Sequence, residues 1–429
     1  MNEQTITIKE GIRLHCIPCD KFTSNTFTVH FLAPLTQKGA PLANLLAKVL
    51  KKGCVLYPTQ EDIAKRSEEL YASSVVAGVS KIGEAQSFFM SFSALDNRFA
   101  FDNTDIAEGA FSLFSALLLE PCLENGAFKE SVLKREKIAL LDRIAAKINN
   151  KGAYAMQRCR EIMCEDEVYR FSLDGKREDV EGITSAELYD WYLNMLKTAP
   201  IEIYYVGSEE ISAVSARVKG LFADFAPRSP FAFDTKVISR VGAVKRVTEE
   251  VDAVQGKLVM GFRTSVCAKD KDFLALMLFD AVYGSSPVSK LFMNVREKLS
   301  LCYYCASATD IDKGIMFVYS GVENKNAKAA EDEILKQLEE IRQGNVTETE
   351  LLCAKASLLD TLRSTEDNAY SIERFLLTQS LRESHLTLFD YMKGIEALGV
   401  EDIVRVAKGI IPDTVYFLAG NGKGGEDDA

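Results

Sequence analysis

The spacing of apolar residues divides the first half of the chain into strands and helices. The apolar run 27–31 predicts a buried strand, and between residues 42 and 50 four leucines and a valine recur at the spacing of one helix face. A second helix is predicted over 59–71. The runs 75–80 and 86–92 predict two strands joined by a short polar turn. A longer helix over 131–149 and a strand over 201–206 complete the pattern.

The second half of the chain repeats this order of elements. It predicts a strand ending at Phe262, helices from Phe273 and over 289–299, strands over 301–309 and 315–322, a helix over 347–362 and a strand over 414–419. Single landmarks coincide when the halves are aligned. The pairs are Phe31 with Phe262, Gly53 with Gly284, Gly83 with Gly314, Gly126 with Gly344, Leu140 with Leu358 and Tyr204 with Phe417. An ordered series of this kind indicates a duplicated unit.

The repeat predicts the fold class and the domain boundaries. Helices alternate with adjacent pairs of strands, which favours an α+β fold with a mostly antiparallel sheet and helices on one face. We therefore expect two tandem homologous α/β domains, 1–227 and 237–429. Pro227 and Pro230 lie close together between them, which is typical of a linker, placed here at 228–236.

Composition and charge exclude several classes of protein. The chain has 429 residues, 47% of them hydrophobic, which suits more than one core and rules out intrinsic disorder. A net charge of −11 is the wrong sign for a dedicated nucleic-acid-binding protein. No apolar stretch approaches the ~20 residues that span a bilayer, and the first residues do not resemble a secretory signal. Ten scattered cysteines are typical of a reducing compartment, so we expect a cytoplasmic location.

The histidines show no zinc-ligand pattern. His15, His30 and His385 lie far apart in the sequence, and neither H-x-x-E-H nor H-E-x-x-H occurs. A catalytic zinc site normally takes three protein ligands, usually including histidine. We therefore expect structural or surface histidines and no metal ion in this chain.

Two C-x-x-C pairs occur, Cys16 with Cys19 and Cys302 with Cys305, and both lie in runs that favour strands. Residues three apart in a strand point to opposite faces, so neither pair is expected to converge. Disulfide exchange by either pair, or one zinc site formed by both, is the less favoured alternative.

The run 289–303, Ser-Lys-Leu-Phe-Met-Asn-Val-Arg-Glu-Lys-Leu-Ser-Leu-Cys-Tyr, resembles the second-domain signature of pitrilysin/insulinase-type zinc peptidases, particularly those similar to mitochondrial processing peptidase. Arg296 and Tyr303 match the Arg and Tyr of that signature in type and spacing. The resemblance implies a bilobal, clam-shell half in which the two residues clamp a peptide at the zinc site of an opposing domain. A purely structural role remains the alternative for these two residues. In it, Arg296 pairs with Glu297 and Tyr303 packs in the sheet.

The first half departs from the family pattern. In active members the first-domain helix carries H-x-x-E-H, whose histidines bind Zn²⁺ while the glutamate acts as general base. Here Asn44 and Lys48 occupy the histidine positions and Ala47 that of the base. Arg143, next to Asp142, aligns with the third ligand. The resemblance therefore implies a degenerate, metal-free site.

Two functions of different classes follow. The first is a zinc-free, non-catalytic subunit of a bacterial-type two-subunit metallopeptidase, inactive alone, which contributes Arg296 and Tyr303 in trans to a peptide substrate. Its partner would be a homologous H-x-x-E-H subunit carrying the Zn²⁺, and the two would form a heterodimer. The alternative is a non-enzymatic peptide-binding or scaffold protein, as a homodimer or as a subunit of a larger assembly. A neighbouring gene for an H-x-x-E-H homologue favours the first.

Overall fold

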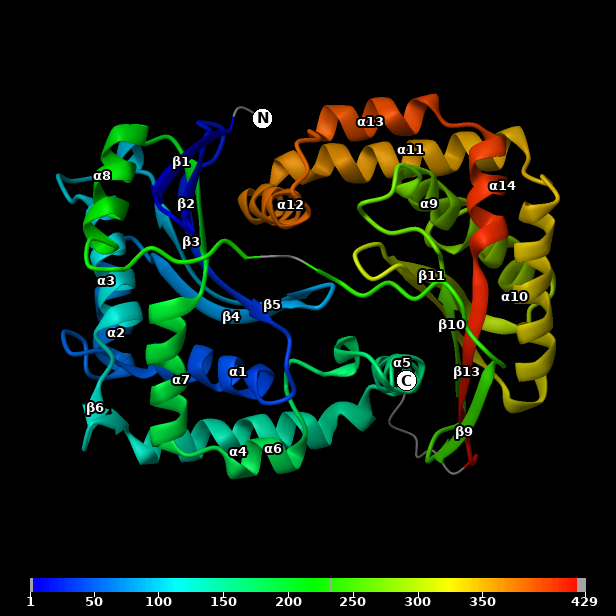
Figure 1. Cartoon of the computed structure of the whole chain (residues 1–429), viewed down its shortest axis with the longest axis horizontal. Helices are drawn as coiled ribbons and strands as arrows, with labels where there is room; N and C mark the ends of the chain where they lie inside the picture. The colour runs from blue at the N-terminus through cyan, green and yellow to red at the C-terminus, as the bar shows by residue number, and fades with distance from the viewer. Residues whose placement is uncertain (1–2, 232–233, 423–429) are drawn as a thin grey trace. The chain divides into compact units, whose positions relative to one another are not determined.

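The computed structural model describes residues 3–231 and 234–422, which form two compact units (Figure 1). Unit 1 comprises Met1–Ala145, Phe171–Asp234 and Glu366–Glu383, and unit 2 comprises Ala146–Arg170, Thr235–Thr365 and Ser384–Ala429. The domains expected from the repeat stay a prediction, and residues 232 and 233 of the linker lie outside the described residues. The units differ from those domains because each contains one segment from the other half of the chain.

Unit 1 is built on a sheet with the strand order β1-β2-β8-β3-β5-β4. The strands are β1 Gln4–Lys9, β2 Ile12–Pro18, β3 Ser24–Pro34, β4 Ser74–Ile82, β5 Ala85–Leu95 and β8 Ile201–Gly207, with a small hairpin of β6 Leu123–Glu124 and β7 Ala127–Phe128. β2 and β8 are parallel, whereas the other neighbours in the sheet are antiparallel.

Helices cover both faces of this sheet. They are α1 Gly39–Val49, α2 Gln60–Glu69, α3 Ile106–Leu119, α4 Glu130–Ala146, α6 Arg177–Gly182, α7 Ser185–Thr198, α8 Ile211–Leu221 and α12 Ala369–Arg382. On one face α1, α3 and α7 form the main core with the sheet, where the ring of Phe27 meets those of Phe111 and Phe114 at 5.4 Å. On the other face, α12 packs its apolar side chains against β2, β3 and β8.

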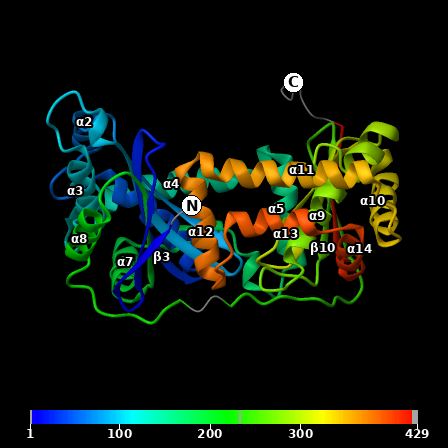
Figure 2. The same ribbon diagram turned by 90° about the horizontal axis from the view of Figure 1, so that it is seen from above.

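Unit 2 has a sheet in the order β11-β12-β10-β13-β9. Its strands are β9 Lys245–Val251, β10 Gly256–Arg263, β11 Cys302–Asp310, β12 Ile315–Val322 and β13 Ile411–Gly420. Its helices are α5 Lys151–Met163, α9 Phe273–Asp280, α10 Ala327–Arg342, α11 Glu348–Ser364, α13 Leu388–Ala397 and α14 Val400–Gly409. α9, α10 and α14 cover one face, and α10 lies beside α14 (Figures 1 and 2).

α5 covers the other face of the second sheet, with Ala155, Cys159 and Met163 in contact with strand residues. Gly261 of β10 permits this close approach, because a Cβ there would lie 2.6 Å from the Met163 sulfur. α5 comes from the first half of the sequence and α12 from the second, so each half supplies a helix to the sheet of the other half. The predicted α+β fold is confirmed, and these two helices add a layer on the second face of each sheet.

The five strands β2-β8-β3-β5-β4 of the first sheet correspond in order to β9-β13-β10-β12-β11 of the second, and β1 is an additional edge strand. β3, at the centre of the first, pairs antiparallel with β5 and β8, and β10 pairs in the same way with β12 and β13. Phe31 and Phe262 therefore occupy equivalent strands, as the repeat predicts. Gly83 and Gly314 both have positive φ, 53° and 66°, in equivalent hairpin turns, which explains why glycine recurs there.

Two further observations concern the helices. The predicted helix 289–299 is a π-helix over Leu291–Lys298, whose wider turn includes a bond from the Leu299 N–H to the Asn294 carbonyl. A second π-helical turn, Ala281–Ser285, continues α9. Among the described residues, none of the helices combines the length and the apolar character that a transmembrane span requires.

Candidate functional site

The helix that the resemblance aligns with the zinc-binding helix of active members is α1. Leu42, Leu45, Leu46 and Val49 point into the core of unit 1 and fix its orientation. Ala47 is also buried in this core, so the position of the general base holds a methyl group without hydrogen-bonding capacity.

Asn44 and Arg143 come together in the structure. A guanidinium N–H of Arg143, on α4, donates to the Asn44 Oδ1 at 3.1 Å, and the same group pairs with Asp174 at 2.5 Å. The Asn44 amide donates in turn to Asp174 at 3.0 Å and to the Leu173 carbonyl. Two residues predicted to replace zinc ligands are therefore neighbours, and a permanent cation lies between their elements. Electrostatic repulsion by this guanidinium disfavours a divalent metal ion at this point.

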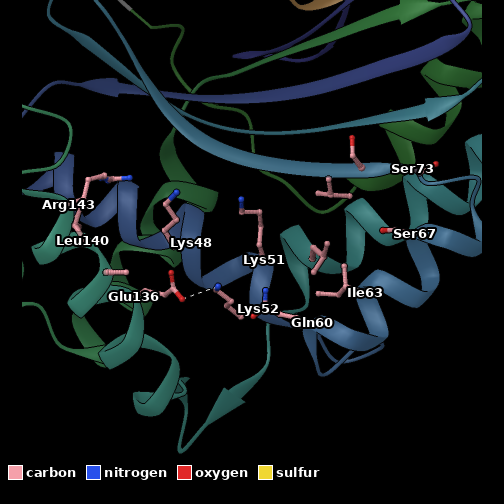
Figure 3. Close-up of a pocket in the computed structure, with 14 residues that line it drawn as sticks. Lys48, Lys51, Lys52, Gln60, Ile63, Ser67, Ser73, Glu136, Leu140 and Arg143 are labelled. Atoms are coloured by element: carbon pink, nitrogen blue, oxygen red, sulfur yellow. Dashed lines mark ion pairs between the residues drawn. The ribbon is translucent and has the colours of Figure 1, made fainter. Parts of the chain in front are cut away.

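Arg143 and Lys48 line a cavity of about 640 Å³ in unit 1 (Figure 3). Lys51 and Lys52, in the 3-10 turn Leu50–Lys52 that follows α1, add two more cations. Figure 3 shows the side chains of Lys48 and Lys51 pointing to the same side of their helix. Glu136 is the one carboxylate among the described lining residues, and it forms an ion pair with Lys52 at 3.0 Å. The cavity is thus strongly cationic, although the chain as a whole is acidic.

The positive charge of the cavity affects the pKa of Lys51. Burial lowers the pKa of its ammonium group, and the nearby charges of Lys48 and Lys52 lower it further, against a smaller opposing effect of Glu136. Lys48 and Lys51 form no hydrogen bond or ion pair with another described residue. This cationic cavity was not predicted from the sequence. Three lysines within five positions were a local signal for it, but their proximity to Arg143 depends on how α4 packs.

The second candidate site begins on the π-helix of unit 2. Leu291 and Val295 anchor this helix in the core, which leaves Arg296 on its outer side with its side chain 42% exposed. The guanidinium lies 4.7 Å from the ring centre of Phe292 and 3.5 Å from the Glu297 carboxylate. Both contacts are local to the helix, so the guanidinium retains donors for a ligand.

Tyr303 lies in a β-bulge seven residues after Arg296. Cys302 is opposite Val322 and Tyr304 is opposite Gly321, so Tyr303 is an extra residue without a cross-strand partner. The side chain is 65% exposed, and its hydroxyl has no hydrogen-bond partner among the residues that the structure describes. The expectation that this ring could pack in the sheet is wrong, because the bulge turns it outwards.

The bulge also corrects the expectation for one C-x-x-C pair. Cys302 and Cys305 lie opposite Val322 and Ser320, which are two apart on a regular strand and so share a face. Both cysteines therefore point to the same face of the second sheet. Cys16 and Cys19 behave as predicted, since Cys16 lies in the core on one face of the first sheet and Cys19 packs against the cluster on the other.

The histidines have structural environments. His15 is buried and bonds to the carboxylates of Glu3 and Glu202 at 2.6 and 2.7 Å, and buried His30 bonds to Glu373 at 2.8 Å. His385 is exposed. Within residues 3–231 and 234–422, no group of three or more His, Cys, Asp or Glu side chains has the arrangement of a metal site.

Comparisons with known proteins agree with this description. Residues 182–358 match the family model described as the peptidase M16 inactive domain. The chain is 31% identical over 410 residues to a protein of Bacillus subtilis named probable inactive metalloprotease YmfF, and the alignment covers 96% of each chain.

Solved structures show the same fold over nearly the whole chain. A conserved protein from Enterococcus faecalis superposes with a TM-score of 0.92 at 26% identity, covering 99% of this chain and 100% of that one. A peptidase M16 inactive domain from Pseudomonas fluorescens gives a TM-score of 0.81 at 18% identity with the same coverage. With this likeness over nearly the whole chain and no H-x-x-E-H in its sequence, the chain belongs to the M16, or pitrilysin/insulinase-type, peptidase family as a member that lacks the zinc motif.

Proposed function

We propose that this chain is the zinc-free subunit of a two-subunit peptidase and that it contributes Arg296 and Tyr303 to a peptide bound at the zinc site of an H-x-x-E-H partner. The observation that carries the proposal is the exposure of both side chains, at the family spacing, on a π-helix and a β-bulge. Features of these two kinds occur frequently at functional sites. An exposed tyrosine hydroxyl without a partner has no evident role in stabilising the sheet.

Each residue has a defined role in this proposal. The planar guanidinium of Arg296 supplies several fixed donors, which suits a peptide carbonyl or a terminal carboxylate. The hydroxyl of Tyr303 donates a hydrogen bond to the oxyanion that develops when water attacks the scissile carbonyl. The partner supplies Zn²⁺ and the general base, which this chain lacks at Asn44, Ala47 and Lys48.

The test combines the purified chain with an H-x-x-E-H homologue from the same cell. We expect peptidase activity from the mixture that neither protein has alone. Tyr303→Phe should lower kcat by ~10²–10³, because it removes one oxyanion donor. Arg296→Ala should also raise KM if the guanidinium holds the bound peptide.

Matched controls are available at neighbouring positions. Tyr304→Phe changes the adjacent ring, which lies in the sheet near Lys257, and Lys298→Ala removes an exposed cation two residues from Arg296. Both controls should keep full activity, and gel filtration should show the same association for all variants. Full activity of both Arg296→Ala and Tyr303→Phe in a verified complex would contradict the proposed roles.

The cationic cavity favours a second candidate, which is peptide binding without cleavage by a homodimer or a larger assembly. In that case no H-x-x-E-H homologue would gain activity from this chain, and co-purification from the native cell would recover the chain with itself or with proteins that lack the motif.

A further inference from the structure

The cavity at the degenerate site has the composition of a binding site for an anion. Lys48, Lys51 and Lys52 line it from one end of α1 and the following turn, and Arg143 lines it from α4. The rest of the lining includes apolar side chains of Ile63 and Leu140 and polar groups such as Ser67 and Gln60. Its volume of about 640 Å³ lies within the range of ligand sites, ~300–1,000 Å³.

The charges in this cavity are incompletely compensated by the protein itself. Lys52 pairs with Glu136, and Arg143 pairs with Asp174. Lys48 and Lys51 are half-buried and form no ion pair within the described part of the chain, and Glu136, which affects the charge of Lys51, is already paired with Lys52. Half-buried like charges repel one another and are partly desolvated, so a bound anion would relieve both unfavourable effects.

We propose that this cavity binds carboxylates of an acidic peptide, with Lys48 and Lys51 as the principal contacts. The apolar lining favours a peptide over a bare inorganic anion, because apolar side chains next to the carboxylates would be buried with them. The inference rests on the peptide binding proposed above and adds the class of peptide. Where active relatives hold Zn²⁺, this chain presents ammonium groups that attract negatively charged peptide segments.

The test measures direct binding to the chain alone by isothermal titration calorimetry. The probes are two peptides with blocked termini, one alternating Leu and Glu and the other alternating Leu and Gln. The wild-type chain should bind the Glu peptide at least about tenfold more tightly, which corresponds to ~1.4 kcal/mol, because its carboxylates can accept charge-assisted hydrogen bonds from the lysines. Affinity for the Glu peptide should also fall as salt is added.

The variants separate the cavity from general charge effects. Lys48→Gln with Lys51→Gln should remove the preference for the Glu peptide. Lys65→Gln with Lys134→Gln changes the net charge by the same amount at exposed positions of α2 and α4, and this variant should retain the preference for the Glu peptide. Glu136→Gln removes the competing carboxylate and should tighten binding of the Glu peptide. Circular dichroism checks the fold of each variant.

Several results would overturn this proposal. They are equal affinity for the two peptides, equal binding by the two double-lysine variants, or no gain in affinity from Glu136→Gln. Binding of inorganic phosphate without binding of the Glu peptide would also overturn it in favour of a phosphate site. Arg296 and Tyr303 stay intact throughout, so a negative result here is distinct from a failure of the proposed peptidase role.

A separate observation concerns Cys302 and Cys305, which the bulge brings to the same face of the second sheet. Cys305 is 3% exposed and Cys302 is half-buried, so Cys302 is the more accessible residue of the pair. The neighbouring Cys305 thiol lowers the pKa of Cys302 to about 7, with further contributions from Ser320 and Arg296 and against the effect of burial. The neighbouring Cys302 and burial raise the pKa of Cys305 well above its usual value.

We infer that Cys302 and Cys305 form an intrachain disulfide by exchange with a low-molecular-weight disulfide. The Cys302 thiolate attacks one sulfur of that disulfide, which forms a mixed disulfide and releases one thiolate. Cys305 then attacks the Cys302 sulfur as its proton passes to the second departing thiolate. The two cysteines are oxidised, one disulfide is reduced to two thiols, and Tyr303 lies inside the closed loop.

Glutathione disulfide is a suitable probe. The pair Cys16 and Cys19 is the internal control, because it has the same sequence spacing but its two side chains lie on opposite faces of the first sheet. Peptide mapping by mass spectrometry should show a disulfide between Cys302 and Cys305 in the wild type and none between Cys16 and Cys19. Cys305→Ser should instead accumulate the mixed disulfide at Cys302, and Cys302→Ser should leave Cys305 reduced. A stable mixed disulfide in the wild type, or equal oxidation of both pairs, would refute the inference.

Discussion

Replacing Glu167 by Gln is expected to destabilise unit 2 strongly, because it removes one anion from a buried group of four charges. Its carboxylate lies 2.8 Å from the Arg263 guanidinium and 2.5 Å from the Lys313 ammonium, and Arg263 also pairs with Asp413 at 2.8 Å. The four side chains are at most 6% exposed. Through them, the segment after α5 is joined to β10, to the β11–β12 turn and to β13.

The magnitude follows from the charge balance. Glu167→Gln leaves two buried cations with one carboxylate, and removing one partner of a buried pair costs ~3–5 kcal/mol. For a domain of this size 1 kcal/mol corresponds to ~2–4 °C, so the melting temperature of unit 2 should fall by roughly 6–20 °C. Charge-conserving removal of a pair, as in Glu167→Gln with Lys313→Met, should restore part of the loss because the remaining charges balance.

The assay is thermal and urea unfolding followed by far-ultraviolet circular dichroism. Trp191, the chain's one tryptophan, lies on α7 in unit 1, so its fluorescence reports that unit separately. The matched control is Glu165→Gln, which makes the same substitution two residues away at an exposed ion pair with Lys245. That variant should unfold almost as the wild type does, since exposed pairs contribute little.

The same group predicts a pH dependence. Burial alone would raise the pKa of Glu167, but hydrogen bonds from Arg263 and Lys313 outweigh it and hold the pKa below its usual value of 4.5. Its stabilising contribution is therefore present above pH ~4.5 and lost as the pH falls through the lowered pKa of the folded state. If Glu167→Gln and Glu165→Gln shift the unfolding midpoint equally, the reasoning about this buried group is wrong.

Three further outcomes are expected. The purified chain should hold far less than one zinc ion, because Arg143 and Lys48 lie where ligands would be needed, and tightly held stoichiometric zinc after mild chelation would contradict this. Lys51→Met should raise the free energy of unfolding at neutral pH, because it removes a half-buried charge. In urea unfolding, the wild type should become more stable as the pH rises from the lowered pKa of Lys51 towards its ordinary 10.5, and this increase should be absent in Lys51→Met. The pKa of His15 is lowered by burial but raised overall by its bonds to Glu202 and Glu3, so its stabilisation is full below pH ~6.5 and is lost as the pH rises through the raised pKa. His15→Gln should flatten this dependence, and an unchanged pH profile would exclude the role of His15.

The repeated core could be predicted because the residues that recur in both halves are determined by their local conformation and burial. Gly83 and Gly314 recur since their turns need positive φ, and Phe31 and Phe262 recur since both lie on central strands. The exchange of α5 and α12 could not be predicted. The apolar pattern of a helix shows that it has a face to bury but not which sheet will cover that face.

The candidate sites divide in the same way. Arg296, Tyr303 and the absence of zinc ligands are local features of the sequence. The exposure of Tyr303 and the convergence of Cys302 with Cys305 depend on one extra residue in β11, which is determined by pairing with β12. The cavity depends on α4 bringing Arg143 to α1, which is a tertiary contact.

The exchanged helices have a consequence for the folding of the chain during its synthesis. All six strands of the first sheet have been made when β8 has emerged from the ribosome, yet its second face still exposes Ile17, Leu32 and Val206 until α12 has been made. The second sheet likewise lacks its inner strand β13 until residues 411–420 have been made. Unit 1 therefore matures only after α12 has been made, and unit 2 only after β13 has been made. Chains that terminate early would present apolar sheet surface to chaperones and degradative proteases.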